Sequence, residues 1–257
     1  QDRLAEKAFL AINRIPVAPF AAVPDLDTLD AELAEIGAPA VLKTTRLGYD
    51  GKGQQLVRNG ADAGYAFETL TPKPLVLEAF IEFEREISVV IARGMNGETA
   101  AYDPAENVHR DHILKTSTVP AAISRKTRRD AIAIAERIAT ALDYVGVLGV
   151  EFFVLPGGGL LVNEIAPRVH NSGHWTEAVC VTDQFEQHIR AICGWPLGDP
   201  ARLADVVMEN LIGNEVAAVP AILVGASQPH LYGKAEPRQG RKMGHINRIL
   251  PRATRSK

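Results

Sequence analysis

Two glutamates in neighbouring apolar segments have the spacing that most directly suggests chemistry. Glu151 lies in GVEFFV, Glu164 lies in LLVNEIA, and the turn sequence PGGG (156–159) separates the two segments. If PGGG closes a symmetric hairpin in which Pro156 faces Gly159, the two glutamates lie opposite each other on one face of the sheet. Like charges in that position destabilise a strand pair, whereas Mg²⁺ is typically held by one or two carboxylates together with nucleotide phosphates. A solvent-facing pair is the alternative, but the apolar neighbours favour a sheet buried on both sides and a Mg²⁺ site.

A glycine-rich segment, GYDGKG (48–53), has the composition of a phosphate-binding loop. Its three glycines allow a close approach of the backbone to an anion, and Lys52 adds a point charge. Such a loop is weak evidence by itself, because it is often only a turn, and the segment matches neither the P-loop nor the dinucleotide-binding pattern. Lys43 strengthens the interpretation. It ends a predicted strand, where a buried ammonium needs a partner, and we expect a phosphate to be that partner.

A dense group of polar side chains follows the second glutamate. The segment APRVHNSGHW (166–175) places five of them within seven residues: Arg168, His170, Asn171, Ser172 and His174. A single histidine is more often structural, but a short loop with this many donors favours ligand recognition.

Composition and charge limit the classes of function. The chain has 257 residues, 46% of them hydrophobic and 23% charged, and a net charge of −3, as in ordinary globular proteins. No apolar segment approaches the ~18 residues of a membrane helix, and the first ten residues carry charges where a signal peptide would be apolar. We therefore expect no membrane partner. Two cysteines, Cys180 and Cys193, exclude a disulfide framework and fit a reducing, cytoplasmic setting.

Positive charge is concentrated near the end of the chain, where residues 230–257 hold eight basic side chains and one acid. Nucleic-acid binding is the weakest interpretation, because the segment lacks the interleaved aromatic residues of a single-strand binder and the chain as a whole is acidic. A pocket for a small phosphorylated ligand fits Lys234 to His245 better, because charges alternate there with glycine and apolar residues.

Periodicity predicts a mixed α+β chain. Helices are expected over 2–13, 26–36, 61–70, 124–142 and 176–193, and strands over 39–45, 54–57, 74–80, 84–94, 97–102, 145–155 and 159–166. Hairpins such as the one closed at Asn96-Gly97 exclude a purely alternating βαβ order.

The order of the motifs resembles one family of ATP-grasp ligases. VLKT, GYDGKGQ, EAFIEFEREISV, ENVHRDHIL, GVEFFV, NEIAPRVHNSGHW and GRKMGHIN are similar to the N(5)-carboxyaminoimidazole ribonucleotide synthetases of purine biosynthesis over essentially the whole chain. The resemblance implies an ATP-grasp fold, in which two α+β subdomains clasp ATP. We expect the first subdomain at 1–73, the second at 74–195 and a small β-rich region at 196–257. The family's N-terminal pre-ATP-grasp domain is expected to be absent from this chain.

The resemblance also implies site residues. Those matching the family's ATP-binding positions are Arg3, Lys43, Gly48, Tyr49, Asp50, Gly51, Lys52, Gly53, Gln54, Glu78, Ala79, Phe80, Ile81, Glu86, His109, Asn163 and Glu164. Those matching its ribonucleotide-binding positions are Tyr49, Asp50, Arg168, His170, Asn171, Lys234, Arg241 and Lys242.

The implied reaction joins bicarbonate to the amine of 5-aminoimidazole ribonucleotide, with ATP and Mg²⁺, through carboxyphosphate. Lys52 and Arg168 are expected to hold carboxyphosphate, and Asp50 or His170 to accept the amine proton. The expected partners are these small molecules and, in the full-length form, a second copy of the protein.

Two alternatives remain open. The chain could be another ATP-grasp ligase, such as a formate-dependent glycinamide ribonucleotide transformylase or a biotin carboxylase, although GYDGKGQ favours the first family because the transformylase typically has serines ahead of GKGQ. It could also be a catalytically incomplete nucleotide-binding fragment, against which the full set of lysines and glutamates argues.

Overall fold

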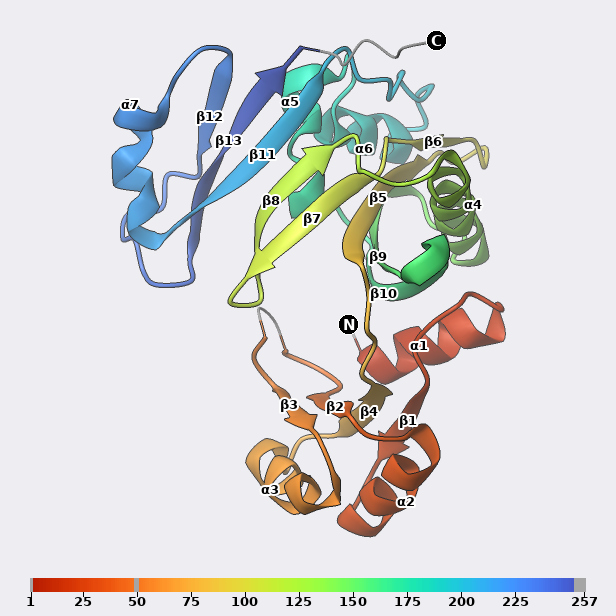
Figure 1. The fold of residues 1–257 in the computed structure, drawn as a ribbon. Helices are drawn as coiled ribbons and strands as arrows, with labels where there is room; N and C mark the ends of the chain where they lie inside the picture. Colours follow the sequence, from red (N-terminus) through yellow and green to blue (C-terminus); the bar gives the residue numbers. More distant parts are fainter. Residues whose placement is uncertain (1, 49–50, 252–257) are drawn as a thin grey trace.

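The computed structural model describes residues 2–48 and 51–251, which form two antiparallel sheets flanked by helices (Figure 1). The smaller sheet has the strand order β1-β4-β2-β3. The larger has the order β10-β9-β5-β7-β8-β11-β13-β12, with β6 paired to β5. The predicted α+β class is confirmed. Within residues 2–48 and 51–251, no helix combines the length and apolar character needed to cross a membrane.

The smaller sheet and its two helices form one end of the molecule (Figure 1). The elements are β1 (Phe20–Val23), α2 (Leu26–Ile36), β2 (Ala40–Thr44), β3 (Gln54–Val57), α3 (Gly60–Leu70) and β4 (Leu75–Ala79). Asp25 caps α2 by accepting from the backbone of Thr28, and Gly37 ends the helix with a positive φ of 92°. Leu29, Leu42 and Leu77 are fully buried between the helices and the sheet.

The larger sheet carries the rest of the chain. Its strands are β5 (Arg85–Arg93), β6 (Thr99–Ala101), β7 (Ala105–Arg110), β8 (Ile113–Val119), β9 (Gly146–Val154), β10 (Leu160–Ala166), β11 (Asp205–Ile212), β12 (Ser227–Leu231) and β13 (Lys242–Leu250). Its helices are α4 (Arg125–Ala141), α5 (Thr176–Val179), α6 (Gln184–Ile192) and α7 (Val219–Ile222), with single 3₁₀ turns η1 (Pro156–Gly158), η2 (Asn171–Gly173) and η3 (Gly213–Ala218).

Both faces of the central strands are covered, as the apolar sequences predict. Helix α4, capped by Ser124, packs Ala135 and Ile138 against one face of β5 and β9, where Ile87 and Val89 are fully buried. The other face carries Val90, which belongs to a separate core that includes Trp175. A sheet buried on both sides gives the strands that carry the site a rigid support.

Helix α1 (Arg3–Ile12) joins the two parts of the molecule (Figure 1). Asp2 caps it by accepting from the backbone of Ala5. Leu10 on this helix, and Ile15 after it, are buried in the core of the larger sheet, although the chain then continues into β1 of the smaller one. The helix therefore places its polar face between the two sheets.

One predicted helix is wrong. Residues 176–193 form two helices, α5 and α6, rather than one. Cys180 ends α5 in an extended conformation, and Asp183 begins α6 by accepting from the backbone of Phe185 and Glu186. The Asp183 side chain satisfies amide groups that a continuous helix would have bonded internally, so it favours the start of a second helix at this residue. Strand β1 and the hairpin of β7 and β8 also lie outside the elements predicted from the sequence.

The two sheets divide the chain differently from the expected subdomains. Strand β4 belongs to the smaller sheet, which therefore extends to Ala79, beyond the boundary expected at residue 73. Strands β11, β12 and β13 continue the larger sheet through the pairing of β11 with β8. The expected C-terminal β-rich region thus has no sheet of its own. The subdomain boundaries themselves stay a prediction.

Candidate active site

A cavity of about 710 Å³ lies where α1 and the two sheets meet. Most of the predicted site residues line it, although they are spread over almost the whole chain. They are Arg3, Lys43, Gly48, Gly51, Gln54, Glu78, Ala79, Phe80, Ile81, Glu86, His109, Glu151, Asn163, Glu164, Arg168, His170, Asn171 and Lys242. The wall also includes residues that sequence reasoning missed, among them Glu6, Lys7, Phe83, His112 and Phe153.

A few predicted residues fall outside this wall. Tyr49 and Asp50 lie outside the described residues. Lys52, Gly53, Lys234 and Arg241 do not line the cavity, although Lys234 lies beside it and donates to the carbonyl oxygen of Lys242 at 2.6 Å. Their roles stay predictions.

The two glutamates of β9 and β10 lie directly opposite each other, as predicted. The turn that connects them is different from the prediction, because Leu155 rather than Pro156 pairs with Gly159. Next to the turn Phe152 faces Val162, and a bulge between Val162 and Glu164 then restores the predicted register. The symmetric hairpin was therefore wrong, but the pairing inferred from it is confirmed.

Among the described residues, burial and like charge dominate the environment of Glu151. Burial and then the charge of Glu164 raise the pKa of Glu151 to about 7. The imidazole Nε2 of His170 lies 3.6 Å from Oε1 of Glu151, but His170 is itself held neutral, since burial and then the charge of Arg168 lower its pKa to about 3. Two partly buried carboxylates that face one cavity have the donor chemistry of a Mg²⁺ site.

A second acid, Glu78 of β4, holds two lysines together. Its Oε2 lies 3.0 Å from Nζ of Lys43 and 3.1 Å from Nζ of Lys7. Glu78 therefore compensates the ammonium of Lys43 within the protein, and the phosphate expected as a partner of Lys43 stays a prediction. Burial alone would raise the pKa of Glu78, but the charges of Lys43 and Lys7 outweigh it and hold the pKa below 4.5. Burial lowers the pKa of Lys43, because it disfavours the charged ammonium.

The sequence contained a signal for Lys7. It lies four residues after Arg3 and three before Leu10, so all three share one face of α1. Leu10 is buried, and a lysine on that buried face requires an acidic partner.

Helix α1 also supplies a buried acid to the same wall. Oε1 of Glu6 accepts a hydrogen bond from the backbone nitrogen of Ile165 at 2.9 Å, and so ties α1 to β10 beside Glu164. Burial raises the pKa of Glu6 to about 7, even though this hydrogen bond opposes the shift.

Arg3 holds the start of the glycine-rich segment. Its guanidinium donates to the carbonyl oxygens of Thr44 at 3.1 Å and Gly48 at 3.2 Å. Glycine is required here by space as well as by backbone angle. A Cβ at Gly48 would lie 2.5 Å from the Arg3 guanidinium, and one at Gly53, where φ is 73°, would lie 2.6 Å from Oγ1 of Thr44. The segment joins β2 to β3, as predicted.

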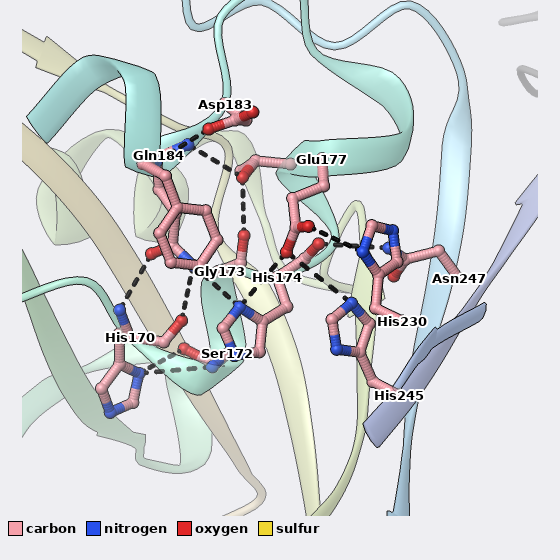
Figure 2. A network of polar contacts seen from close by, with 12 residues as sticks. His170, Ser172, Gly173, His174, Glu177, Asp183, Gln184, His230, His245 and Asn247 are labelled. Atoms are coloured by element: carbon pink, nitrogen blue, oxygen red, sulfur yellow. Dashed lines mark hydrogen bonds and ion pairs between the residues drawn. The ribbon is translucent and has the colours of Figure 1, made fainter. Parts of the chain in front are cut away.

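The polar segment after β10 divides its side chains between two places. Arg168, His170 and Asn171 line the cavity. Ser172 and His174 do not line it. The Ser172 hydroxyl contacts Nδ1 of His170 at 2.8 Å, and His174 stacks on His245 with ring centroids 4.7 Å apart (Figure 2). Of the five donors in this segment, the three expected to contact the ribonucleotide line the cavity, and their binding of ligand stays a prediction.

Glu86 and His109 face each other across the cavity end of β5 and β7. Nδ1 of His109 lies 3.3 Å from Oε2 of Glu86. Burial alone would lower the pKa of His109, but the Glu86 carboxylate outweighs burial and raises it. A charged pair at this wall can bind the hydroxyl groups of a sugar.

Family models match most of the chain. The model of the ATP-grasp domain matches residues 8–185, and that of the phosphoribosylaminoimidazole carboxylase C-terminal domain matches residues 206–256. Among curated relatives, the N5-carboxyaminoimidazole ribonucleotide synthase of Brucella melitensis is 56% identical over 98% of this chain and 70% of its own length. That of Bacillus subtilis is 44% identical over 96% of this chain, which spans 65% of that relative.

Solved structures give the same result. An N5-carboxyaminoimidazole ribonucleotide synthetase in complex with ADP superposes with a TM-score of 0.93 at 43% identity, over 97% of this chain and 67% of that one. The Aspergillus clavatus enzyme in complex with ADP and 5-aminoimidazole ribonucleotide superposes with a TM-score of 0.92 at 30% identity, over 98% of this chain and 69% of that one. With its motifs and cavity, this chain belongs to the ATP-grasp superfamily and, within it, to the N5-carboxyaminoimidazole ribonucleotide synthase family.

Proposed function

We propose that this protein carboxylates 5-aminoimidazole ribonucleotide with bicarbonate and ATP, giving N5-carboxyaminoimidazole ribonucleotide, ADP and phosphate. The observation that carries the proposal is the opposition of Glu151 and Glu164 in a cavity that also contains the glycine-rich segment and Arg168. The relative solved with both ADP and the ribonucleotide supports the choice of substrates. This chain spans about two thirds of the length of these relatives, and the activity of the whole enzyme is part of the proposal.

Glu151 and Glu164 would hold Mg²⁺. They fit the ion because their like charges face each other at close range and because the pKa of Glu151 is raised by burial and by Glu164, as expected for carboxylates that lack a cation. When bound, Mg²⁺ would neutralise charge on the ATP phosphates.

The nucleotide would lie along the wall formed by β4 and the segment after it. Phe80 and Ile81 line the cavity beside Phe83, whose ring stacks on Phe153 at 4.6 Å. This apolar wall suits the adenine ring, and the Glu86–His109 pair at 3.3 Å suits the ribose hydroxyls. Lys43 would bring its charge to the phosphates while Glu78 keeps it ionised.

Transfer would proceed in two steps. A bicarbonate oxygen attacks the γ-phosphorus and ADP leaves, which gives carboxyphosphate. The ribonucleotide amine then attacks the carboxyl carbon, phosphate leaves, and the amine proton passes to a base. Arg168 lines the cavity where it can pair with the anionic intermediate.

His170 is a poor candidate for the base, and Asp50, which lies outside the described residues, stays the other predicted candidate. A group with a pKa of about 3 has little affinity for a proton at neutral pH. Nδ1 of His170 contacts Ser172 and Nε2 faces Glu151, so the ring is well held to orient its neighbours. Lys242, which lines the cavity, is placed to meet the ribonucleotide phosphate.

The test is the acceptor dependence of ADP release by the natural full-length protein. We expect ADP only when 5-aminoimidazole ribonucleotide and bicarbonate are both present, with ¹³C from labelled bicarbonate in the product. ADP release with glycinamide ribonucleotide and formate, or with biotin, would assign the protein to another ATP-grasp reaction. A homodimer and a cytoplasmic location stay predictions from the family resemblance.

A further inference from the structure

A second cluster of ligand-type side chains lies outside the cavity described above. It consists of Glu177 on α5, His230 on β12 and His245 on β13 (Figure 2). Strand pairing explains why the imidazoles meet, because His230 lies directly opposite His245 in the antiparallel register. Helix α5 then brings Glu177 against the same edge of both rings. None of the three residues lines the cavity.

The distances bring one carboxylate to several imidazole nitrogens. Oε2 of Glu177 lies 3.0 Å from Nδ1 of His230, and Oε1 lies 3.7 Å from Nε2 of His245. Nδ1 of His174 lies 3.5 Å from Oε1 as well. One ligand atom from each of Glu177, His230 and His245 lies within 4.8 Å of the others.

One nitrogen in this cluster has no hydrogen bond. Nε2 of His245 is buried without a partner, while Nδ1 of the same ring contacts the Tyr232 hydroxyl at 2.9 Å. A buried polar atom without a hydrogen bond is unfavourable, and this nitrogen, 3.7 Å from Oε1 of Glu177, is open to a ligand. The His245 ring is stacked between those of His174 and His230, each with centroids 4.7 Å away, and protonation of neighbouring rings would place like charges face to face.

We propose that Glu177, His230 and His245 bind one divalent transition metal ion of the Zn²⁺ type. Two imidazoles and a carboxylate are a common ligand set for Zn²⁺, with bonds of about 2.0–2.2 Å. The His230 and His245 rings are parallel to within 7° and their nitrogen lone pairs lie in the ring planes, so binding one ion would require the two rings to tilt toward a common point beside the Glu177 carboxylate. The His230 side chain is 37% exposed, which leaves room for a water ligand and a path of entry.

Bound metal would stabilise the part of the cavity wall that contains His170, through contacts on the side away from the cavity. It would fix β12 and β13 to α5. His174 connects this cluster to Gln184, because its Nδ1 lies 3.5 Å from Oε1 of Glu177 and 3.2 Å from Nε2 of Gln184. Gln184 in turn bonds both the backbone nitrogen and the carbonyl oxygen of His170, at 2.9 and 2.8 Å. Figure 2 shows this chain of contacts from Glu177 to His170. The proposal does not depend on the proposed function.

The competing interpretation is an ordinary ion pair between Glu177 and a protonated His230. It explains the 3.0 Å contact but leaves Nε2 of His245 without a partner. Binding of metal to the purified protein distinguishes the two.

The experiment is equilibrium binding of Zn²⁺ in excess Mg²⁺, which occupies the Glu151–Glu164 pair, with Co²⁺ absorption as a report on imidazole coordination. The test variants are Glu177→Gln and His230→Ala. Their matched controls are Glu186→Gln, an exposed glutamate on α6, and Gln228→Ala, an exposed residue of β12. Glu164→Gln is added to exclude binding at the catalytic pair, and circular dichroism confirms that each variant is folded.

We expect one Zn²⁺ per chain in the wild-type protein, in both controls and in Glu164→Gln. Affinity should fall at least about tenfold in Glu177→Gln and in His230→Ala, with loss of the Co²⁺ band. If Glu177→Gln fails to fold, the partly exposed His230→Ala decides. Absence of Zn²⁺ binding in excess Mg²⁺, or equal binding by wild type and His230→Ala, would overturn the proposal.

Discussion

Glu151 lies directly opposite Glu164 because a bulge at Asn163 shifts the register of β9 and β10 by one residue. The pairing next to the turn, Phe152 with Val162, would without the bulge place Asn163 opposite Glu151 and turn Glu164 to the other face. A one-residue irregularity therefore creates the carboxylate pair, and the apolar core on both sides of the sheet holds the pair in place.

Replacing Glu164 with glutamine should abolish turnover while leaving the fold intact. The amide removes a charged Mg²⁺ ligand, so we expect kcat to fall by about 100-fold or more, as measured by ADP release with the ribonucleotide present. The same change relieves like-charge repulsion, so the metal-free variant should unfold at a higher temperature than wild type.

Glu98→Gln is the control for this change, because Glu98 is exposed in the turn between β5 and β6. It should alter neither measurement. Near-native ADP release by Glu164→Gln would show that the metal assignment is wrong.

Replacing Glu78 with glutamine should strongly destabilise the protein, because it leaves Lys7 and Lys43 buried side by side without their anion. Breaking a buried ion pair in this way costs about 3–5 kcal/mol. Lys7→Met should cost less, since Lys43 still pairs with Glu78. Chemical denaturation gives the free energy of unfolding of the wild type, Glu78→Gln and Lys7→Met. Glu35→Gln, on the exposed side of α2, is the control.

Glu78 also predicts a loss of stability in acid. Its pKa in the folded protein is below 4.5, so its stabilising contribution is complete above pH 4.5 and is lost as the pH falls through the lower folded value. The free energy of unfolding should therefore decrease below pH 4.5 in wild type and less steeply in Glu78→Gln. Equal slopes would contradict the assignment of this triad.

The raised pKa of Glu6 predicts the opposite pH dependence of the free energy of unfolding. Burial raises its pKa from 4.5 to about 7, so the folded state binds the proton more tightly and stability falls as the pH rises from about 4.5 to about 7. At 1.4 kcal/mol per unit, the ionised carboxylate costs on the order of 3 kcal/mol above pH 7. Glu6→Gln, measured in EDTA, should reduce this slope without abolishing it, because glutamine can still accept from Ile165, while Glu151, whose pKa is also raised to about 7, keeps its own contribution.

A Glu6→Gln protein whose unfolding free energy keeps the wild-type slope between pH 5 and 7 would show that Glu6 is not the titrating group. The exposed Glu98→Gln serves as the control and should keep the slope.

Changing His170 to asparagine should lower activity equally at every pH. The imidazole has a pKa of about 3, so it stays neutral from pH 5 to 9 and contributes no step to the pH–rate profile. Because it orients groups beside Glu151, we expect kcat to fall on the order of 100-fold. Should an acid limb near pH 6.5 disappear in the variant, His170 would be a titrating catalytic base. Ser172→Ala, which removes the contact to Nδ1, should show a smaller loss of the same form.

The sequence alone determined the local structure and the chemical character of the site. Helix ends at Asp25, Gly37 and Ser124 follow from side-chain caps and backbone freedom within a few residues. The two glutamates flanking PGGG lie on strands joined by a short turn, so their opposition depends on few contacts. The polar group at 168–174 marked, for the same local reason, a segment that contributes Arg168, His170 and Asn171 to the cavity wall.

Tertiary structure decided which side chains meet across long separations in the chain. Lys43 and Lys7 meet at Glu78, His174 turns to His245 instead of the cavity, and the bulge at Asn163 sets the final register. Each outcome depends on the packing of α1, α5 or β13 against strands distant in sequence. Local propensity carries no information on such contacts, because their energies depend on burial and partners that exist only once the chain is folded.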